Sequence, residues 1–301
     1  MLDPDENLPP VSAPLVDPAE LRSWVLFEDE RLLVLDKPGW LVVHPSKRGP
    51  WSSLAGAVRE GLGLQTIRLV YRLDRETSGV VVLAKDEATG RRLQKAVAGR
   101  LIGKAYGAIV EGEMREPQAV ALPLGPDLRS EVTVRQRVVE AGTAGAQAAQ
   151  TVFTPLAVAG GFTLAGVQLL TGRKHQIRAH AEAVGHRVVG DKLYGPDAAL
   201  YLEFAREGWT PRHSALLPMT RQALHCAAID LRPAGMDYRL RAPWPADLAR
   251  FAERRMGLSA ATVQGLMDGF VAELMPGGEA PISNLQASEN DQAAKQPKFG
   301  G

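Results

Sequence analysis

The sequence predicts an α+β fold in which a mixed or antiparallel β-sheet core is flanked by helices. Short apolar runs typical of strands alternate with amphipathic segments, but without the regular strand, helix, strand rhythm of a doubly wound sheet. The chain has 301 residues, of which 45% are hydrophobic, so it can bury a substantial core. No G-x-G-x-x-G motif follows an expected strand, so the sequence does not support a dinucleotide-binding domain.

The expected elements follow from hydrophobic periodicity and from the residues that interrupt it. In the first half these are two short strands on either side of a break at residues 37–39, a helix capped by Ser52 or Ser53 and ending near residues 61–63, a buried strand over 80–84, a helix over 87–99 and an alternating strand over 103–112. In the second half they are a strand over 162–170, a helix opened by Thr171 and Gly172 and ended by Gly185, an insertion with its own short helices over 197–223, and a strand over 224–231.

Composition divides the chain into three parts. Residues 1–20 hold five prolines and clustered acids and are expected to be a flexible leader, and residues 275–301 are expected to be a disordered tail. Residues 21–274 would form a single folded domain. The sequence has neither a signal peptide nor an apolar run of the roughly 18 residues that a membrane helix needs. Its single cysteine, Cys226, excludes an internal disulfide, so we expect a cytoplasmic protein with no membrane partner.

Charge is unevenly distributed along the chain. Residues 1–30 contain one cation and eight carboxylates, whereas residues 68–106 contain nine cations and four carboxylates. A concentrated basic segment can bind phosphates even though the whole chain carries a net charge of only +1. For the group Arg91, Arg92 and Lys95 alone, a solvated helix face is an equally good explanation. No coiled-coil heptad or long apolar stripe favours an obligate dimer, so a monomer is expected.

Several kinds of site are excluded by spacing. The six histidines form no H-E-x-x-H motif and have no carboxylates at metal-binding spacing, so no metal site is expected. The closest approach to a nucleotide triphosphate loop is GRLIGKA, residues 99–105. It is one residue short between its glycines and lacks the Ser or Thr that would hold magnesium.

The remaining candidate is the stretch YRLDRETSGVVVLAKD, residues 71–86. Asp74 lies between Arg72 and Arg75, directly before the buried strand. Neighbouring positive charge favours the ionised form of a carboxylate, which can then act as a nucleophile or base. Taken alone, however, an Arg-Leu-Asp tripeptide is more often part of a structural ion pair in a surface loop.

Four sequence blocks that occur in a fixed order favour a catalytic role for Asp74 over a structural ion pair, because together they resemble a known family. LLVLDKPGWLVVHPS, YRLDRETSGVVVLAKD, KAYGAIVEG and LLTGRKHQIRAHAEAVGHRVVGDKLYG resemble the successive motifs of the RluA-type pseudouridine synthases, which isomerise uridine in RNA. The resemblance covers residues 32–195, and RQALHCAAIDLRP is similar to the closing strand of the family. It implies the pseudouridine synthase catalytic fold, with a central RNA-binding cleft and no metal or organic cofactor. The implied partner is ribosomal or transfer RNA, and DNA is not expected.

The resemblance also implies individual roles. Asp74 would be the essential carboxylate, Tyr106 would stack on the flipped uracil, and Arg178 would pair with Asp74 and keep it charged. The remaining expected RNA contacts are Arg72, which enters the RNA stack, Ile177, which packs beside the base, and Arg173, Lys174 and Lys104, which bind phosphates or support the site. His175 and His180 flank Arg178 and are expected to be packing residues.

Two features depart from the family pattern. Tyr71 stands where histidine is usual, which leaves activity intact but puts local RNA contacts in doubt. The insertion over residues 197–223 is longer than in compact members and is expected to bear on which RNA is recognised.

The expected reaction breaks the N1–C1′ bond of uridine, rotates the uracil and forms a C5–C1′ bond. Asp74 could attack C1′ or remove the proton at C2′, and the sequence does not choose between these routes. Two other classes stay open: an RNA-binding protein on the same fold that performs no chemistry, and a glycosidase or nucleoside hydrolase that releases free uracil.

Overall fold

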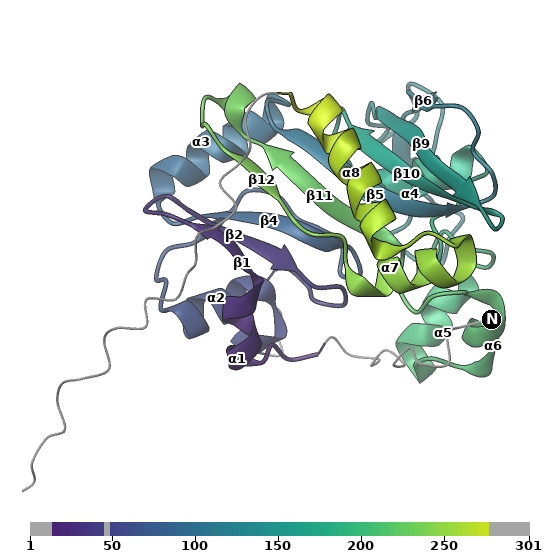
Figure 1. The fold of residues 1–301 in the computed structure, drawn as a ribbon, viewed down its shortest axis with the longest axis horizontal. Helices are drawn as coiled ribbons and strands as arrows, with labels where there is room; N and C mark the ends of the chain where they lie inside the picture. Colours follow the sequence, from purple (N-terminus) through teal and green to yellow (C-terminus); the bar gives the residue numbers. More distant parts are fainter. Residues whose placement is uncertain (1–13, 45–48, 277–301) are drawn as a thin grey trace, which may run out of the picture.

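The computed structural model describes residues 14–44 and 49–276, and its strands form one large sheet (Figure 1). Within these residues the sheet has ten strands in the order β1-β2-β4-β11-β5-β10-β9-β6, with β12 beside β11 and β3 beside β4. The bounds are Val25–Glu28 (β1), Leu32–Lys37 (β2), Arg68–Leu69 (β3), Ser78–Ala84 (β4), Gly103–Glu111 (β5), Gln118–Val120 (β6), Thr151–Ala159 (β9), Phe162–Leu169 (β10), Leu224–Asp230 (β11) and Arg239–Arg241 (β12). β4 and β11 pair in parallel and the other described pairs are antiparallel, which confirms the α+β class with a mixed sheet.

A second, two-stranded sheet and the helices surround this core. The small sheet pairs β7 (Leu124–Pro126) with β8 (Gln136–Val138). The helices are α1 (Pro18–Leu21), α2 (Leu54–Leu62), α3 (Glu87–Ala98), α4 (Gln176–Ala183), α5 (Ala199–Glu207), α6 (Pro211–Leu216), α7 (Ala246–Phe251), which continues into one π-helical turn at Ala252–Met256, and α8 (Ala260–Leu274). None of the described helices is both long and apolar enough to cross a membrane.

Two cross-strand glycines let α8 and its neighbours pack closely on one face of the sheet (Figure 1). A Cβ atom on Gly107 of β5 would lie 2.3 Å from the ring of Trp244, and one on Gly166 of β10 would lie 2.6 Å from the ring of Phe270 on α8. Side chains alternate along a strand, so Tyr106 points to the opposite face of the sheet from α8. That opposite face is therefore available for a site.

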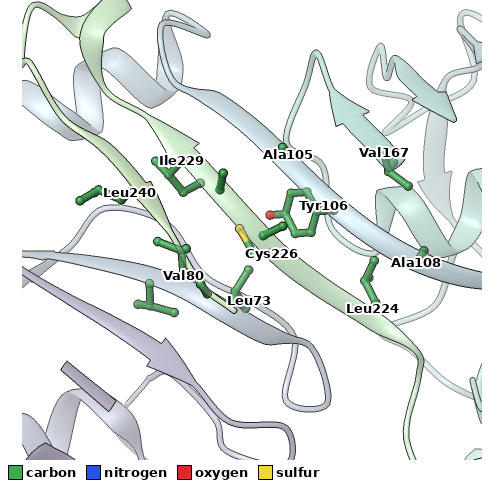
Figure 2. Packing of buried hydrophobic residues seen from close by; sticks show 14 of the residues in the cluster. Leu73, Val80, Ala105, Tyr106, Ala108, Val167, Leu224, Cys226, Ile229 and Leu240 are labelled. Atoms are coloured by element: carbon green, nitrogen blue, oxygen red, sulfur yellow. The ribbon is translucent and has the colours of Figure 1, made fainter. Parts of the chain in front are cut away.

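The parallel pairing of β4 and β11 fixes where the segment before β4 lies. Gly79 has a φ of 108°, and a Cβ there would lie 2.2 Å from the carbonyl oxygen of Cys226, so only glycine fits this approach. On the adjacent strands Cys226 pairs with Tyr106, and Figure 2 shows their side chains close to Leu224 in the buried cluster. The chain entering β4 is thus held near the middle of the sheet.

Most of the expected elements are confirmed. α2 begins at the predicted cap, where Ser53 accepts a hydrogen bond from the amide of Gly56, and it ends at Gly63 in the left-handed conformation. β4 is buried along its whole length. α3, β5, β10, β11 and the insertion helices α5 and α6 also lie where the sequence predicted them.

Three expectations differ from the structure. Residues 41–43 form no second strand, because the carbonyls of Val42 and Val43 accept hydrogen bonds from the first amides of α2. α4 begins at Gln176 rather than at Thr171 and Gly172, because the Gln176 side chain bonds to the loop before it. Within the expected leader, Val16 is buried and its amide donates to the carbonyl of Trp51, whereas residues 1–13 of the expected leader and 277–301 of the expected tail lie outside the described residues.

Candidate active site

Asp74 lies in the segment that joins β3 to β4, residues 70–77, here called the Asp74 loop. The amide of Thr77 donates to the carbonyl of Asp74 at 3.2 Å, which closes a turn. The fully buried Lys37 donates to the carbonyl of Arg75 at 3.1 Å, and also to two carbonyls of the chain that follows β2. One buried ammonium therefore ties the Asp74 loop to β2.

The other side of the loop is held through Glu76. Lys192, which is 2% exposed, forms an ion pair of 2.9 Å with the Glu76 carboxylate. The guanidinium of Arg221 donates to the Glu76 carbonyl at 3.1 Å, and the amide of Gln222 donates to the Glu76 carboxylate at 3.2 Å. The loop is consequently fixed by groups from distant parts of the chain, and the Asp74 side chain has little freedom to move.

Arg178 on α4 bridges two carboxylates. Its Nη1 donates to Oδ2 of Asp74 at 2.9 Å, while Nε and Nη2 donate to the two oxygens of Asp191 at 2.5 and 2.8 Å. Asp191 is fully buried and also accepts from the amides of Leu193 and Tyr194. This second carboxylate holds the guanidinium in the plane from which it reaches Asp74.

The electrostatics of the site keep Asp74 ionised. Burial raises the pKa of Asp74, but the charge and hydrogen bond of Arg178 outweigh it, so the net pKa lies below the ordinary value. The side chain is still 31% exposed, so an incoming group can reach it. The geometry provides a rigid, charged and accessible carboxylate.

His175 lies beside this carboxylate and is neutral at pH 7. It has a left-handed backbone with a φ of 54°, and its Nε2 is 3.9 Å from Oδ1 of Asp74. Burial and the nearby Arg178 lower the pKa of His175 to about 4. Nδ1 lies 3.0 Å from the hydroxyl of Tyr194. This placement agrees with a packing role.

A small hollow of about 70 Å³ opens beside Asp74. Its walls include the predicted side chains Arg72, Tyr106, Arg173, Ile177 and Arg178. Tyr106 and Ile177 are buried and supply apolar surface, whereas Arg72 is exposed. The structure therefore brings together six of the eight predicted site residues, counting Asp74 itself.

The other two predicted residues lie apart from this hollow. Lys174 is exposed and does not line it. Lys104 shares the strand β5 with Tyr106, but its Nζ sits 4.5 Å from the centre of the Tyr71 ring. Tyr71 itself is buried, and its hydroxyl donates to the carbonyl of Val80 at 2.8 Å, so this departure from the family pattern serves the core.

The insertion borders the site on the other side of Asp74. A second hollow of about 230 Å³ is lined by Asp74 and Arg178, and by Tyr201 and Phe204 of α5. The ammonium of Lys192 lies 5.2 Å from the centre of the Phe204 ring. The insertion is thus positioned to contact a molecule bound at Asp74.

Sequence reasoning gave no role to Asp191. The residue lies in a quoted motif block, GDKLYG, but a single acid carries no local signal for a partner on another element. Among the described residues, no group of three or more His, Cys, Asp or Glu side chains could hold a metal ion.

Comparison with known proteins gives one consistent result. The family model described as RNA pseudouridylate synthase matches residues 31–183. An uncharacterized RNA pseudouridine synthase of Chlorobaculum parvum is 33% identical over 255 residues, which is 80% of this chain and 77% of that protein. Ribosomal large subunit pseudouridine synthase D of Zymomonas mobilis is 31% identical over 230 residues, 70% of this chain and 65% of that protein. The solved structure of human RNA pseudouridylate synthase domain containing 4 has a TM-score of 0.60 at 24% identity and covers 79% of this chain and 94% of its own.

Proposed function

This chain belongs to the RNA pseudouridylate synthase family, of the RluA type, and on that premise we propose that it isomerises specific uridines in structured RNA with Asp74 as the essential carboxylate. Membership makes the protein an RNA pseudouridine synthase, which is an isomerase. The observation that carries the role of Asp74 is its 2.9 Å hydrogen bond to Arg178, because that contact keeps an accessible carboxylate ionised at neutral pH.

The ionised carboxylate suits both routes to the product. Asp74 either attacks C1′ as the N1–C1′ bond breaks, or removes the proton from C2′ to give an elimination intermediate. The freed uracil anion then rotates. On the first route C5 attacks C1′ and displaces the Asp74 oxygen, and on the second C5 bonds to C1′ while the carboxyl group of Asp74 returns the proton to C2′. On both routes C5 then loses its proton and N1 gains one, so that Asp74 ends as the free carboxylate. Each route starts from deprotonated Asp74, so Arg178 supports both.

The hollow beside Asp74 would hold the uracil outside the RNA stack. Tyr106 and Ile177 supply apolar surface for the extruded base, and stacking on an aromatic ring contributes about 1–3 kcal/mol. Arg72 is exposed at the rim, where a planar guanidinium can replace the lost stacking partner.

Phosphate binding is proposed for Arg173, Lys174 and Lys104. Binding through phosphates releases counterions, so the affinity for RNA should fall as salt rises from about 50 to 200 mM. Ribosomal RNA is the first substrate to test, because one relative is named a ribosomal large subunit pseudouridine synthase, and transfer RNA is the second. We propose that the protein acts as a monomer in the cytoplasm, where its buried free Cys226 stays reduced.

The test uses ribosomal and transfer RNA transcripts with uridine tritiated at C5, in magnesium-free buffer with chelator. Wild type should release tritium without free uracil, and Asp74→Asn should release none while still binding RNA. Asp268→Asn is the matched control and should retain activity, because this half-exposed carboxylate on α8 pairs with Arg241 at 3.5 Å, away from the Asp74 hollow. Free uracil would instead identify a hydrolase, and RNA binding without tritium release would identify a binding protein.

A further inference from the structure

A larger cavity lies next to the hollow at Asp74. It has a volume of about 440 Å³ and forms where α3 ends, β5 begins and β10 ends, and it is here called the α3 pocket. The α3 pocket shares Leu169 and Arg173 with the smaller hollow, so the two cavities adjoin. Its volume falls in the range of small-molecule sites.

Three cations line the α3 pocket: Arg100, Lys104 and Arg173. Within the described part of the chain, none of them forms an ion pair with a carboxylate. The one carboxylate in the wall, Asp230, is paired with Arg232 at 2.7 Å. The guanidinium groups of Arg100 and Arg173 therefore give the pocket positive charge, whereas burial lowers the pKa of Lys104, whose Nζ lies against the Tyr71 ring.

The outer face of α3 is different. Arg91 pairs there with Glu87 at 3.3 Å, and Arg92 donates to the carbonyls of Ala234 and Gly235. The helix face that carries Arg91, Arg92 and Lys95 is therefore partly occupied by contacts within the protein. Two further cations of the basic segment, Arg100 and Lys104, lie just beyond the C-terminal end of α3 and line the pocket.

Apolar surface complements these cations. Leu101 and Leu170 line the pocket and are 48% and 42% exposed, while the buried Ile102 and Met275 also form part of its wall. Apolar walls with a few cations match the chemistry of a nucleotide, which has a flat base and an anionic phosphate.

The strand geometry connects this pocket to the target base. Lys104 and Tyr106 lie on the same face of β5, two residues and roughly 6.6 Å apart. Arg173 borders both cavities and can contact the phosphate between them. We propose that the α3 pocket binds a second nucleotide of the same RNA strand, one that flanks the target uridine. This inference rests on the proposed RNA substrate and adds a second recognition point to it.

The first test fills the pocket. Ala98 lines it and is exposed at the end of α3, so Ala98→Trp places a ring inside the cavity without touching the Asp74 site. The KM for RNA should rise about tenfold, as expected for the loss of one bound base. Ala88→Trp, at an exposed position in the first turn of the same helix, is the matched control and should leave KM unchanged. Equal KM values for the two variants would overturn the inference.

The second test does not depend on catalysis. Cys226 is fully buried, so Leu170→Cys introduces the one readily accessible thiol, and Val158→Cys, 37% exposed in wild type, gives a control on β9. Large-subunit ribosomal RNA transcript should slow alkylation at position 170 several-fold and leave position 158 unaffected.

The outcomes separate the two proposals. Tritium release without protection at position 170 would reject the α3 pocket and keep the isomerase. Protection without tritium release would keep the pocket as an RNA site and reject the isomerase assignment of Asp74. A thiol at position 170 that reacts slowly without RNA would show that the chain itself fills the pocket, which would also overturn the inference.

Discussion

Removing Arg178 tests how the site is held together. Asp191 is fully buried, and the guanidinium of Arg178 is its only ion-pair partner among the described residues. Arg178→Met leaves this carboxylate in the interior without a counter-charge, which costs about 3–5 kcal/mol of unfolding free energy. Arg178→Met with Asp191→Asn removes both charges, and the amide oxygen of the new side chain can still accept from the amides of Leu193 and Tyr194. The double variant should therefore be more stable than the single one.

The assay is urea unfolding followed by circular dichroism at pH 7. The pKa of Asp191 is below its ordinary value in the folded protein, because Arg178 and the backbone bonds outweigh burial, so its stabilising contribution is complete at pH 7 and is lost as the pH falls below about 4. A double-mutant cycle should give a coupling of about 2 kcal/mol or more between the two residues. A coupling below about 0.5 kcal/mol would refute the argument.

A surface pair provides the control for this cycle. Arg187 and Glu111 contact at 2.8 Å, but their side chains are 37% and 26% exposed. Solvent screening limits such pairs to about 0–1 kcal/mol, so Arg187→Met, Glu111→Gln and the double variant should differ little in stability.

Three further outcomes concern the site, and a fourth concerns the sheet. Because Arg178 lowers the pKa of Asp74, wild-type activity should persist into mild acid. In Arg178→Met the acidic limb of the pH–activity profile should move to higher pH. An unchanged acidic limb would contradict the claim that Arg178 keeps Asp74 ionised. His175 has a pKa of about 4 and stays neutral above it, so no step in activity near pH 6.5 should depend on it, which His175→Gln would check. Tyr106→Phe should keep the apolar platform and most activity, whereas Tyr106→Leu should raise the KM for RNA by roughly tenfold, as steady-state kinetics would measure. Gly107→Ala should lower the melting temperature, since its Cβ would overlap the Trp244 ring, and unchanged thermal unfolding would rule out that contact.

The sequence predicted correctly those elements whose ends or burial are encoded by residues within the element or beside it. The serine cap and the left-handed glycine at the two ends of α2 are encoded within a few residues of the helix, and the apolar run of β4 needs no distant partner to be recognised. The strand expected over residues 41–43 failed because its backbone carbonyls bond to α2, a tertiary contact that overrides strand propensity.

The order of the sequence motifs predicted the main residues of the site. The resemblance pointed to Asp74, Tyr106 and Arg178, and the structure places all three around one hollow. Asp191 was not assigned a role, because its partnership with Arg178 arises where α4 and the following loop pack together. The position of Lys104 was predicted only in part. Strand alternation placed it on the same face of β5 as Tyr106, but the sequence did not show that it lines a separate cavity.

The anchoring of the Asp74 loop has a consequence for how the protein matures. The loop bonds to Arg178, Lys192 and Arg221, which lie 104, 116 and 145 residues further along the chain from their partners. Such non-local contacts are slow to form, because closing the long intervening segments costs conformational entropy. During synthesis the N-terminal part can form its local helices, but Asp74 gains its counter-charge only after α4 has emerged. The contacts that hold the Asp74 loop therefore require the chain to be synthesised at least as far as Arg221.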